Sequence, residues 1–276
     1  MKIIYLILSI LFLSTSLQAA PKAENIDQLA DESQKLFYRG DYDASLEKLQ
    51  KYFSQLEGLS GEKVKLRFFA IVAMGRIYLQ HKQDPKGAIE WFKKFKKSQS
   101  LTDAEKDIIE GWNAAAKDWI KLGKFPKSTK NEKDLFEIGK KYYDAGIKKQ
   151  KYPMDPAGTA DFSIASSYLV PLLVHYDKNP NLGEALFMMG DMRRRLWESN
   201  EYWSENYYLT EAIRRFPKTP TAKKAYEALN DDIRFGYSGS GGEHTPRSWV
   251  ILLDELKKLS EGKVENTTPV EMKPQQ

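Results

Sequence analysis

Apolar residues recur at intervals of three and four along most of this chain, and Gly, Pro or Asn interrupts the pattern repeatedly. This spacing places apolar side chains on one face of an α-helix, which has 3.6 residues per turn. No convincing run of alternating, β-branched strand residues is present. The pattern therefore predicts an all-α protein with helices over residues 26–39, 42–57, 62–81, 85–98, 103–122, 131–148, 159–177, 181–197, 201–216, 219–235 and 246–260.

The first twenty residues follow a different pattern. Lys2 is their only charge, an apolar run covers 3–13, and small and polar residues lead to Ala19 and Ala20 before Pro21. A charged start, an apolar middle and a small-residue exit are typical of a secretory signal peptide. The apolar run is short for a membrane span, which needs about 20 residues, and an uncleaved anchor helix is the alternative. We therefore expect cleavage near Ala20, a periplasmic location and no transmembrane segment in the mature chain.

The rest of the chain divides into one helical region and a tail. Residues 21–261 are expected to form a helical-repeat domain with a bend near 150–158, where two prolines interrupt the helical pattern. Residues 262–276 include the polar stretches 266–268 and 273–276. We expect this C-terminal segment to be a disordered tail.

Composition limits the chemistry available to the chain. It contains no Cys, which excludes thiolate nucleophiles, thiolate metal sites and a lipid anchor on Cys. The net charge of +5 is a small excess for 276 residues, whereas nucleic-acid binders concentrate basic charge more strongly. The three histidines, His81, His175 and His244, show no metal-ligand spacing. We therefore expect no cofactor, no metal, no nucleic-acid partner and no catalysed reaction.

Several patches resemble the tetratricopeptide repeat, which is a pair of antiparallel helices. The first patch consists of Leu29, Ser33, Leu36, Gly40, Tyr42 and Ser45. The second patch consists of Gly75, Tyr78 and Ala88, with one residue inserted near Asp84. In this repeat small residues let two helix backbones approach, and an aromatic residue fills the groove beside the turn.

The third patch runs from 185–190 through 208–213 to 216–225. Its junction, where Phe216 and Pro217 precede Thr219 and Pro220, is similar to that of periplasmic repeat lipoproteins that assemble the outer membrane. Those lipoproteins carry an anchoring Cys that this chain lacks, and residues 103–180 match the repeat poorly. The resemblance implies a superhelix of antiparallel helix pairs whose groove holds a protein or peptide of the cell envelope.

Aromatic residues are concentrated at one helix junction. They are Trp197, Tyr202, Trp203, Tyr207 and Tyr208. At about 100° per residue, Trp203 and Tyr207 share a helix face, and Tyr208 points elsewhere, so one buried stripe cannot hold them all. Trp and Tyr often anchor protein interfaces, and we take Trp197, Trp203, Tyr207 and Tyr208 as candidate partner-binding residues. The alternative is a glycan-binding or glycan-active site, in which these rings stack on sugars beside Glu198, Glu201 and Glu205.

Two basic stretches are further candidates for a contact surface. Residues 62–100 contain ten basic and three acidic residues, and Lys93, Lys94 and Lys97 lie outside an apolar stripe of Ala88, Phe92 and Phe95. These lysines are candidates for binding an acidic partner or for peripheral contact with anionic headgroups, although a plain solvated face fits as well. Arg193, Arg194 and Arg195 present the same ambiguity.

The Gly-rich segment 238–244 is the most unusual stretch of the chain. Backbone amides of such loops can cradle phosphate, but this one lacks a Lys after the glycines and follows a helix. A flexible connector or a tight turn between helices is the simpler interpretation. The sequence as a whole favours an exported scaffold or interaction module of the cell envelope.

Overall fold

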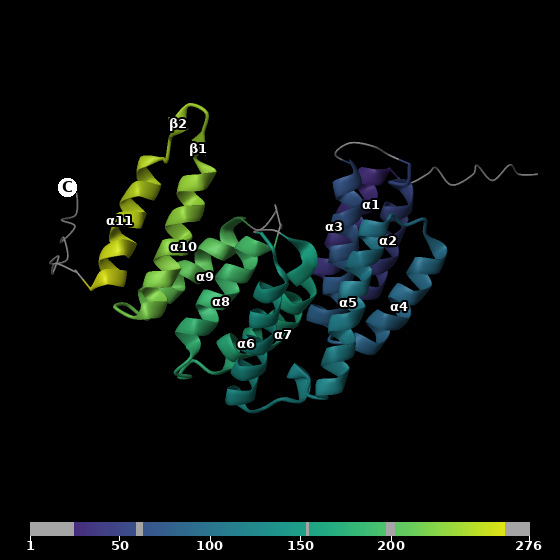
Figure 1. The fold of residues 1–276 in the computed structure, drawn as a ribbon, viewed down its shortest axis with the longest axis horizontal. Coiled ribbons are helices and arrows are strands. Elements are labelled where there is room, and N and C mark those ends of the chain that lie inside the picture. Colours follow the sequence, from purple (N-terminus) through teal and green to yellow (C-terminus); the bar gives the residue numbers. More distant parts are fainter. Residues whose placement is uncertain (1–24, 59–62, 153–154, 197–201, 263–276) are drawn as a thin grey trace, which may run out of the picture.

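The computed structural model describes residues 25–58, 63–152, 155–196 and 202–262. Their helices run alternately in opposite directions along an elongated molecule (Figure 1). The α-helices are α1 (Ile26–Tyr38), α2 (Tyr42–Gln55), α3 (Lys63–Arg76), α4 (Pro85–Ser98), α5 (Asp103–Leu122), α6 (Glu132–Lys149), α7 (Thr159–His175), α8 (Leu182–Arg195), α9 (Tyr202–Arg215), α10 (Pro220–Gly236) and α11 (Arg247–Glu261). Shorter elements are the π-helical η1 (Ile77–Lys82), the 3-10 turns η2 (Pro126–Ser128) and η3 (Pro156–Gly158), and strands β1 (Ser238–Gly239) and β2 (Gly242–Glu243).

The prediction of a mostly helical chain is confirmed, because 80% of the described residues are helical. Local signals in the sequence account for several boundaries. Thr102 begins α5 with a capping box, in which its hydroxyl accepts from the Glu105 amide and Glu105 accepts from the Thr102 amide. Gly123 ends the same helix with a φ of +69°, a conformation that glycine adopts at little cost. Thr219 caps α10 in the same way, because its hydroxyl accepts from the Ala222 amide.

Helices that are consecutive in sequence pack as antiparallel pairs. The pairs are α1 with α2, α4 with α5, α6 with α7, α8 with α9, and α10 with α11. Small residues stand where two helices meet: Ser45 donates to the carbonyl of Ser33 at 2.9 Å, and Gly190 lies against Leu209. A Cβ on Gly190 would come within 2.6 Å of the Leu209 side chain, so only glycine fits this crossing.

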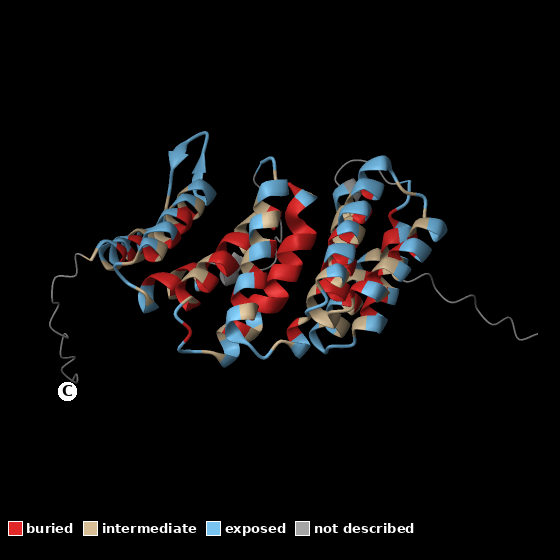
Figure 2. Ribbon diagram, turned by 60° about the horizontal axis from the view of Figure 1, so that its bottom comes forward, coloured by how far each residue is buried: buried red, intermediate tan, exposed pale blue. Residues whose placement is uncertain are grey.

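The buried residues form two clusters that meet at α8. The first cluster extends from α2 to the end of α8, and the second covers α8 to α11. Helix α7 is buried along most of its length (Figure 2). Together with η3 it is long and apolar enough to cross a membrane, but 72% of its most apolar window is buried inside the protein. Burial at the centre of the helical fold explains this composition.

A buried ion pair joins α3 to α5. The Arg67 guanidinium donates to both carboxylate oxygens of Glu105, at 2.7 and 3.1 Å, and to the Ser100 carbonyl at 2.7 Å. It also lies 3.9 Å from the centre of the Phe53 ring on α2. One side chain therefore fixes three neighbouring helices of the N-terminal half.

The Gly-rich segment forms a small antiparallel hairpin that extends beyond the ends of α10 and α11 (Figure 1). Ser238 pairs with Glu243, Gly239 pairs with Gly242, and Gly242 has a φ of +106°. The segment is exposed throughout, and the His244 amide closes it by donating to the Tyr237 carbonyl. It is thus a tight turn between helices, built as a hairpin that the sequence did not predict.

Candidate functional site

The aromatic junction is the first candidate site. Tyr207, on α9, exposes 60% of its surface, whereas Tyr208 is half-buried and contacts both core clusters. The two rings meet edge to face, with centroids 5.5 Å apart. Trp197 and the side chain of Trp203 lie outside the described residues. The junction thus presents one accessible ring that is supported by a second ring in contact with the core.

The packing of α9 determines which of the two tyrosines faces outward. Leu209 is fully buried against Gly190 of α8 and sets the inward direction of α9. At about 100° per residue, Tyr208 lies to the side of that direction and Tyr207 lies nearly opposite to it. The sequence left this choice open, and the contact between Leu209 and Gly190 resolves it.

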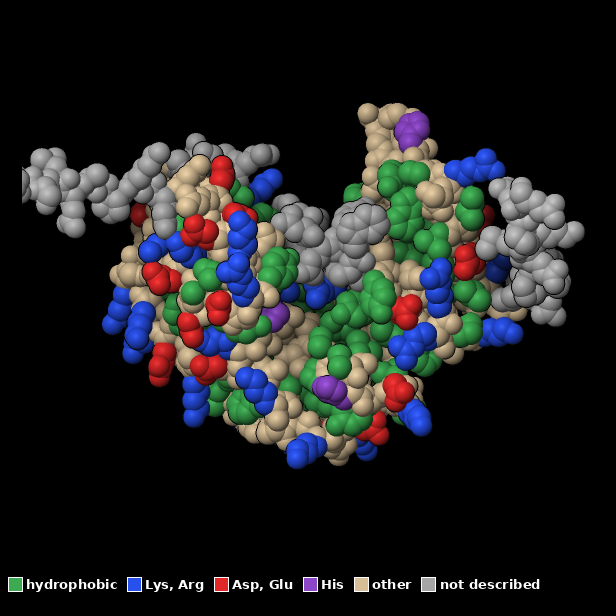
Figure 3. Space-filling model, turned by 180° about the vertical axis from the view of Figure 1, so that it is seen from behind, with side chains coloured by type: hydrophobic (Ala, Val, Ile, Leu, Met, Phe, Trp, Pro, Cys, Tyr) green, Lys and Arg blue, Asp and Glu red, His purple; other side chains and the backbone are tan. Residues whose placement is uncertain are grey.

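Other apolar side chains are accessible near the middle of the chain. Leu173 of α7 and Phe187 of α8 are partly buried and, like Tyr208, contact both core clusters. Val170 and Val174 lie one turn apart on α7, and both are exposed. Figure 3 shows apolar side chains across the floor of a hollow in the rear face, between the two ends of the molecule.

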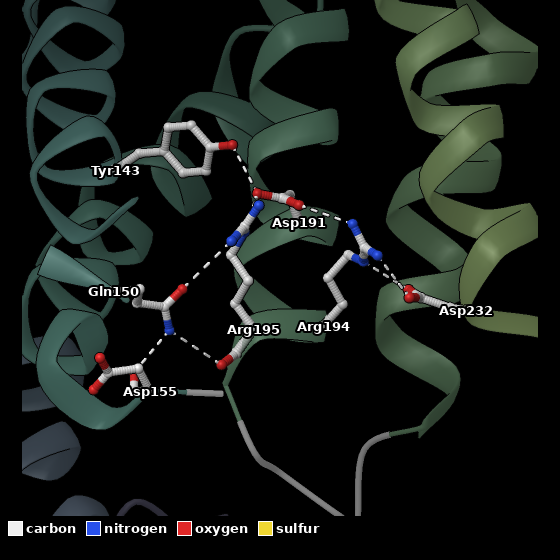
Figure 4. Close-up of polar contacts among 7 residues, drawn as sticks. All are labelled: Tyr143, Gln150, Asp155, Asp191, Arg194, Arg195 and Asp232. Atoms are coloured by element: carbon white, nitrogen blue, oxygen red, sulfur yellow. Dashed lines mark hydrogen bonds and ion pairs between the residues drawn. The ribbon is translucent and has the colours of Figure 1, made fainter. Parts of the chain in front are cut away.

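A network of charged side chains supports α8 just before the junction (Figure 4). Asp191 is almost fully buried and accepts from the Tyr143 hydroxyl at 2.8 Å, from Arg195 at 2.6 Å and from Arg194 at 3.3 Å. Arg194 also forms a two-pronged pair with Asp232 of α10, with both distances 2.8 Å. The network therefore ties α8 to α6 on one side and to α10 on the other.

The electrostatics of this network indicate a structural role. Burial and the neighbouring Asp191 carboxylate raise the pKa of the Tyr143 hydroxyl far above its ordinary value, so it remains a neutral donor. Burial lowers the pKa of Arg194, but its bonds to Asp232 and Asp191 outweigh this effect and raise it. Arg194 and Arg195 are both hydrogen-bonded to carboxylates, which are those of Asp191 and Asp232. Arg194 and Arg195 thus belong to an internal network, and they do not form the open basic surface that was one interpretation of the arginine run.

The basic surface of α4 is present as the sequence suggested. Ala88, Phe92 and Phe95 are buried, and the three candidate lysines Lys93, Lys94 and Lys97 are exposed on the opposite side. Among the described residues none of the three lysines has an ion-pair partner. The neighbouring Lys96 differs, because it reaches Glu110 of α5 at 3.0 Å. The exposed side of α4 therefore carries concentrated positive charge.

His81 is more buried than its place near a helix end suggested. Its ring meets Phe37 edge to face at 4.8 Å and lies 5.6 Å from Tyr42, and its Nε2 atom is buried without a hydrogen-bond partner in the described part of the chain. Burial, with Arg76 and Arg193 nearby, lowers its pKa to about 4. His175 is instead exposed. Within the described ranges no group of three His, Asp or Glu residues could hold a metal ion.

The glycan alternative rests on residues that the structure does not describe. Trp197, Glu198 and Glu201 lie outside the described residues, as do the side chains of Trp203 and Glu205. Their arrangement around a sugar stays a prediction.

A cavity between α3, α5 and η3 was not predicted from the sequence. Its walls come from residues 68, 104–112 and 155–160, which no spacing rule brings together.

Comparisons with protein-family models, with curated proteins and with solved structures give no match for this chain.

Proposed function

We propose that this chain is an exported cell-envelope protein that binds a segment of another protein, without catalysing a reaction. We further propose that its helix pairs are degenerate tetratricopeptide-like repeats in a superhelix. In support, the repeat-like positions behave as packing positions: Ser33 and Ser45 are buried and bonded across the first pair, and Gly40 turns between its helices with a φ of +82°. Gly75, which belongs to the second patch, lies against the ring of Trp112 on α5.

One observation carries the binding proposal, and it is the exposure of Tyr207. A large ring with 60% of its surface accessible lies on a helix whose position is fixed by buried contacts. Tyrosine on a rigid support loses little side-chain entropy on binding, which makes it an effective interface anchor. Tyr208 supports the ring from the side, and the Asp191 network holds α8 beneath the helix.

The charge of the chain indicates the chemistry of the partner. The net charge is +5, and α4 presents lysines without carboxylate partners in the described structure. A positive surface accelerates association with a negatively charged segment and weakens contact with a basic one. We therefore propose that the partner segment combines apolar side chains with Asp or Glu.

Capture from the native cell envelope tests this proposal. Wild-type protein and the Tyr207→Ala variant are used as bait side by side, after their melting temperatures have been compared. We expect at least one protein that is retained by the wild type and depleted with the variant, while the variant melts at nearly the same temperature. Identical captured proteins from both baits would contradict the role of Tyr207.

A further inference from the structure

A cavity of about 400 Å³ lies where the N-terminal helices meet the start of α7. Its volume falls in the range of roughly 300–1,000 Å³ that is typical of small-molecule sites. The lining residues are Phe68 from α3, Ala104, Asp107, Ile108, Gly111 and Trp112 from α5, and Asp155, Pro156, Ala157 and Ala160 from η3 and α7. The walls are therefore mostly apolar, with two carboxylates as the charged groups.

Buried contacts between α3 and α5 hold the walls in place. Trp112 packs against Gly75, where an added Cβ would come within 2.5 Å of the indole. Arg67 precedes the lining residue Phe68 and ties α3 to α5 through the buried pair with Glu105. Contacts within the chain thus fix the walls, and binding would need little rearrangement.

The two charged residues that line the cavity, Asp155 and Asp107, are both carboxylates, and the neighbouring Lys106 forms its ion pair with Asp103 instead. Asp155 is only 7% exposed, and its carboxylate accepts from the backbone amides of Lys151 and Ala157, at 2.9 and 3.0 Å. Figure 4 shows this carboxylate pointing away from Gln150, whose side chain binds the Asp155 carbonyl instead. Neither Asp155 nor Asp107 has an ion pair with a cation in the described structure. A buried carboxylate with amide donors alone is favoured further by a positive charge nearby.

We propose that this cavity binds a small organic cation, an ammonium group carried on an apolar body. The apolar part lies against Phe68, Ile108 and Ala160, and the ammonium faces Asp107 and Asp155. The Phe68 ring adds an attraction for the cation through its π face. This site is separate from the proposed protein-binding surface at Tyr207, and either proposal can fail without the other.

Three probes of similar size and different charge test the site. They are 2-phenylethylamine, which is an ammonium ion at neutral pH, the neutral 2-phenylethanol and the anionic 3-phenylpropionate. Isothermal titration calorimetry gives the affinities, and amide chemical shifts of Ala157 and Ala160 give the location. We expect the amine to bind at least tenfold more tightly than the alcohol, and the carboxylate not to bind. Equal affinities for amine and alcohol, or no binding of the amine at millimolar concentration, would overturn the proposal.

Matched variants separate charge from cavity volume. Asp107→Asn removes an exposed charge that lines the cavity, and it should weaken amine binding at least threefold. Asp103→Asn is the control, because it removes a charge from the same helix outside the lining and should not weaken amine binding. Gly111→Leu should abolish binding by filling the cavity. An added Cβ at Gly111 meets nothing within 4 Å, so the melting temperature should not fall. Binding that survives Gly111→Leu, or that falls equally with both Asp variants, would contradict the assignment.

Discussion

The guanidinium of Arg67 and the carboxylate of Glu105 form an ion pair that is buried on both sides, with Nε and Oε1 2.7 Å apart. Burial raises the pKa of Glu105, but bonds from Arg67 and Thr102 outweigh this effect and lower it below its ordinary value. Both groups are therefore charged in the folded protein, and each depends on the other. Losing one partner would leave a buried charge that nothing compensates.

Replacing Arg67 by Met should destabilise the protein by about 3–5 kcal/mol, as is typical when a buried pair loses one member. Urea unfolding measures this loss. Lys96→Met is the control, because Lys96 forms an ion pair of similar length with the exposed Glu110. The control should lose about 1 kcal/mol or less, since solvent screens exposed pairs. Similar losses in both variants would show that Arg67 is not the structural support described above.

Gly75→Ala should also destabilise the fold. The new Cβ would lie 2.5–2.6 Å from three atoms of the Trp112 ring, which is itself buried. Overpacking of this kind costs about 1–3 kcal/mol. Gly111→Ala, on the same pair of helices, should instead stabilise by roughly 0.5–1 kcal/mol, because alanine favours a helix and meets no obstruction. We expect the melting temperature to fall for Gly75→Ala and to rise for Gly111→Ala. A Gly75→Ala protein as stable as the wild type would contradict the close contact with Trp112.

His81 should make stability depend on pH below neutrality. Its folded pKa is about 4, against 6.5 for a free histidine, so the unfolded chain takes up the proton first. The stabilising effect is complete above pH 6.5 and is lost as the pH falls toward 4, by at most about 3 kcal/mol. His81→Phe keeps the aromatic contacts and should flatten this part of the stability profile. A stability profile that is the same for His81→Phe and the wild type between pH 7 and 4 would contradict the burial of His81.

Regular patterns made the helices predictable. Apart from the end of α3, which lies at Arg76 and is followed by η1, each predicted helix boundary lies within two residues of the observed one where both are described. Local chemistry explains this agreement at Thr102 and Thr219, whose caps need only neighbours in sequence. The hairpin at 238–243 was missed because its strands have two residues each, too short for alternation to appear. The change from α-helix to the π-helical η1 after Arg76 was also not predicted, because the apolar spacing does not change there.

The candidate sites depend on contacts between distant segments, and these were less predictable. The exposure of Tyr207 follows from Leu209 meeting Gly190, a contact between two helices that the sequence does not specify. The sequence left Arg194 open as either a contact residue or a solvated charge, and its bond to Asp232, 38 residues away, depends on the packing of α8 against α10. The cavity next to Asp155 requires three helices to be placed together. By contrast, the exposure of the lysines of α4 was predictable, because one helix with a strong apolar stripe determines which face is exposed.

The lysines of α4 should affect binding without affecting folding. Replacing Lys93, Lys94 and Lys97 together by Gln removes three exposed charges that have no described ion-pair partner. The melting temperature should change little, while association with an acidic partner should slow by tenfold or more at low salt and lose most of its salt dependence. Stopped-flow association rates at several salt concentrations measure this. A rate that does not change with the triple substitution would exclude α4 from the contact surface.

The equilibrium affinity of the captured partner for the Tyr207→Ala variant tests the central claim most directly. Tyr38→Ala is the matched control, because Tyr38 is 68% exposed on α1 and its loss removes a similar ring from another surface. The account predicts that Tyr207→Ala weakens binding by about 2 kcal/mol, roughly thirtyfold, while both variants keep the melting temperature of the wild type. Equal affinities of the two variants and the wild type would contradict a binding site at Tyr207.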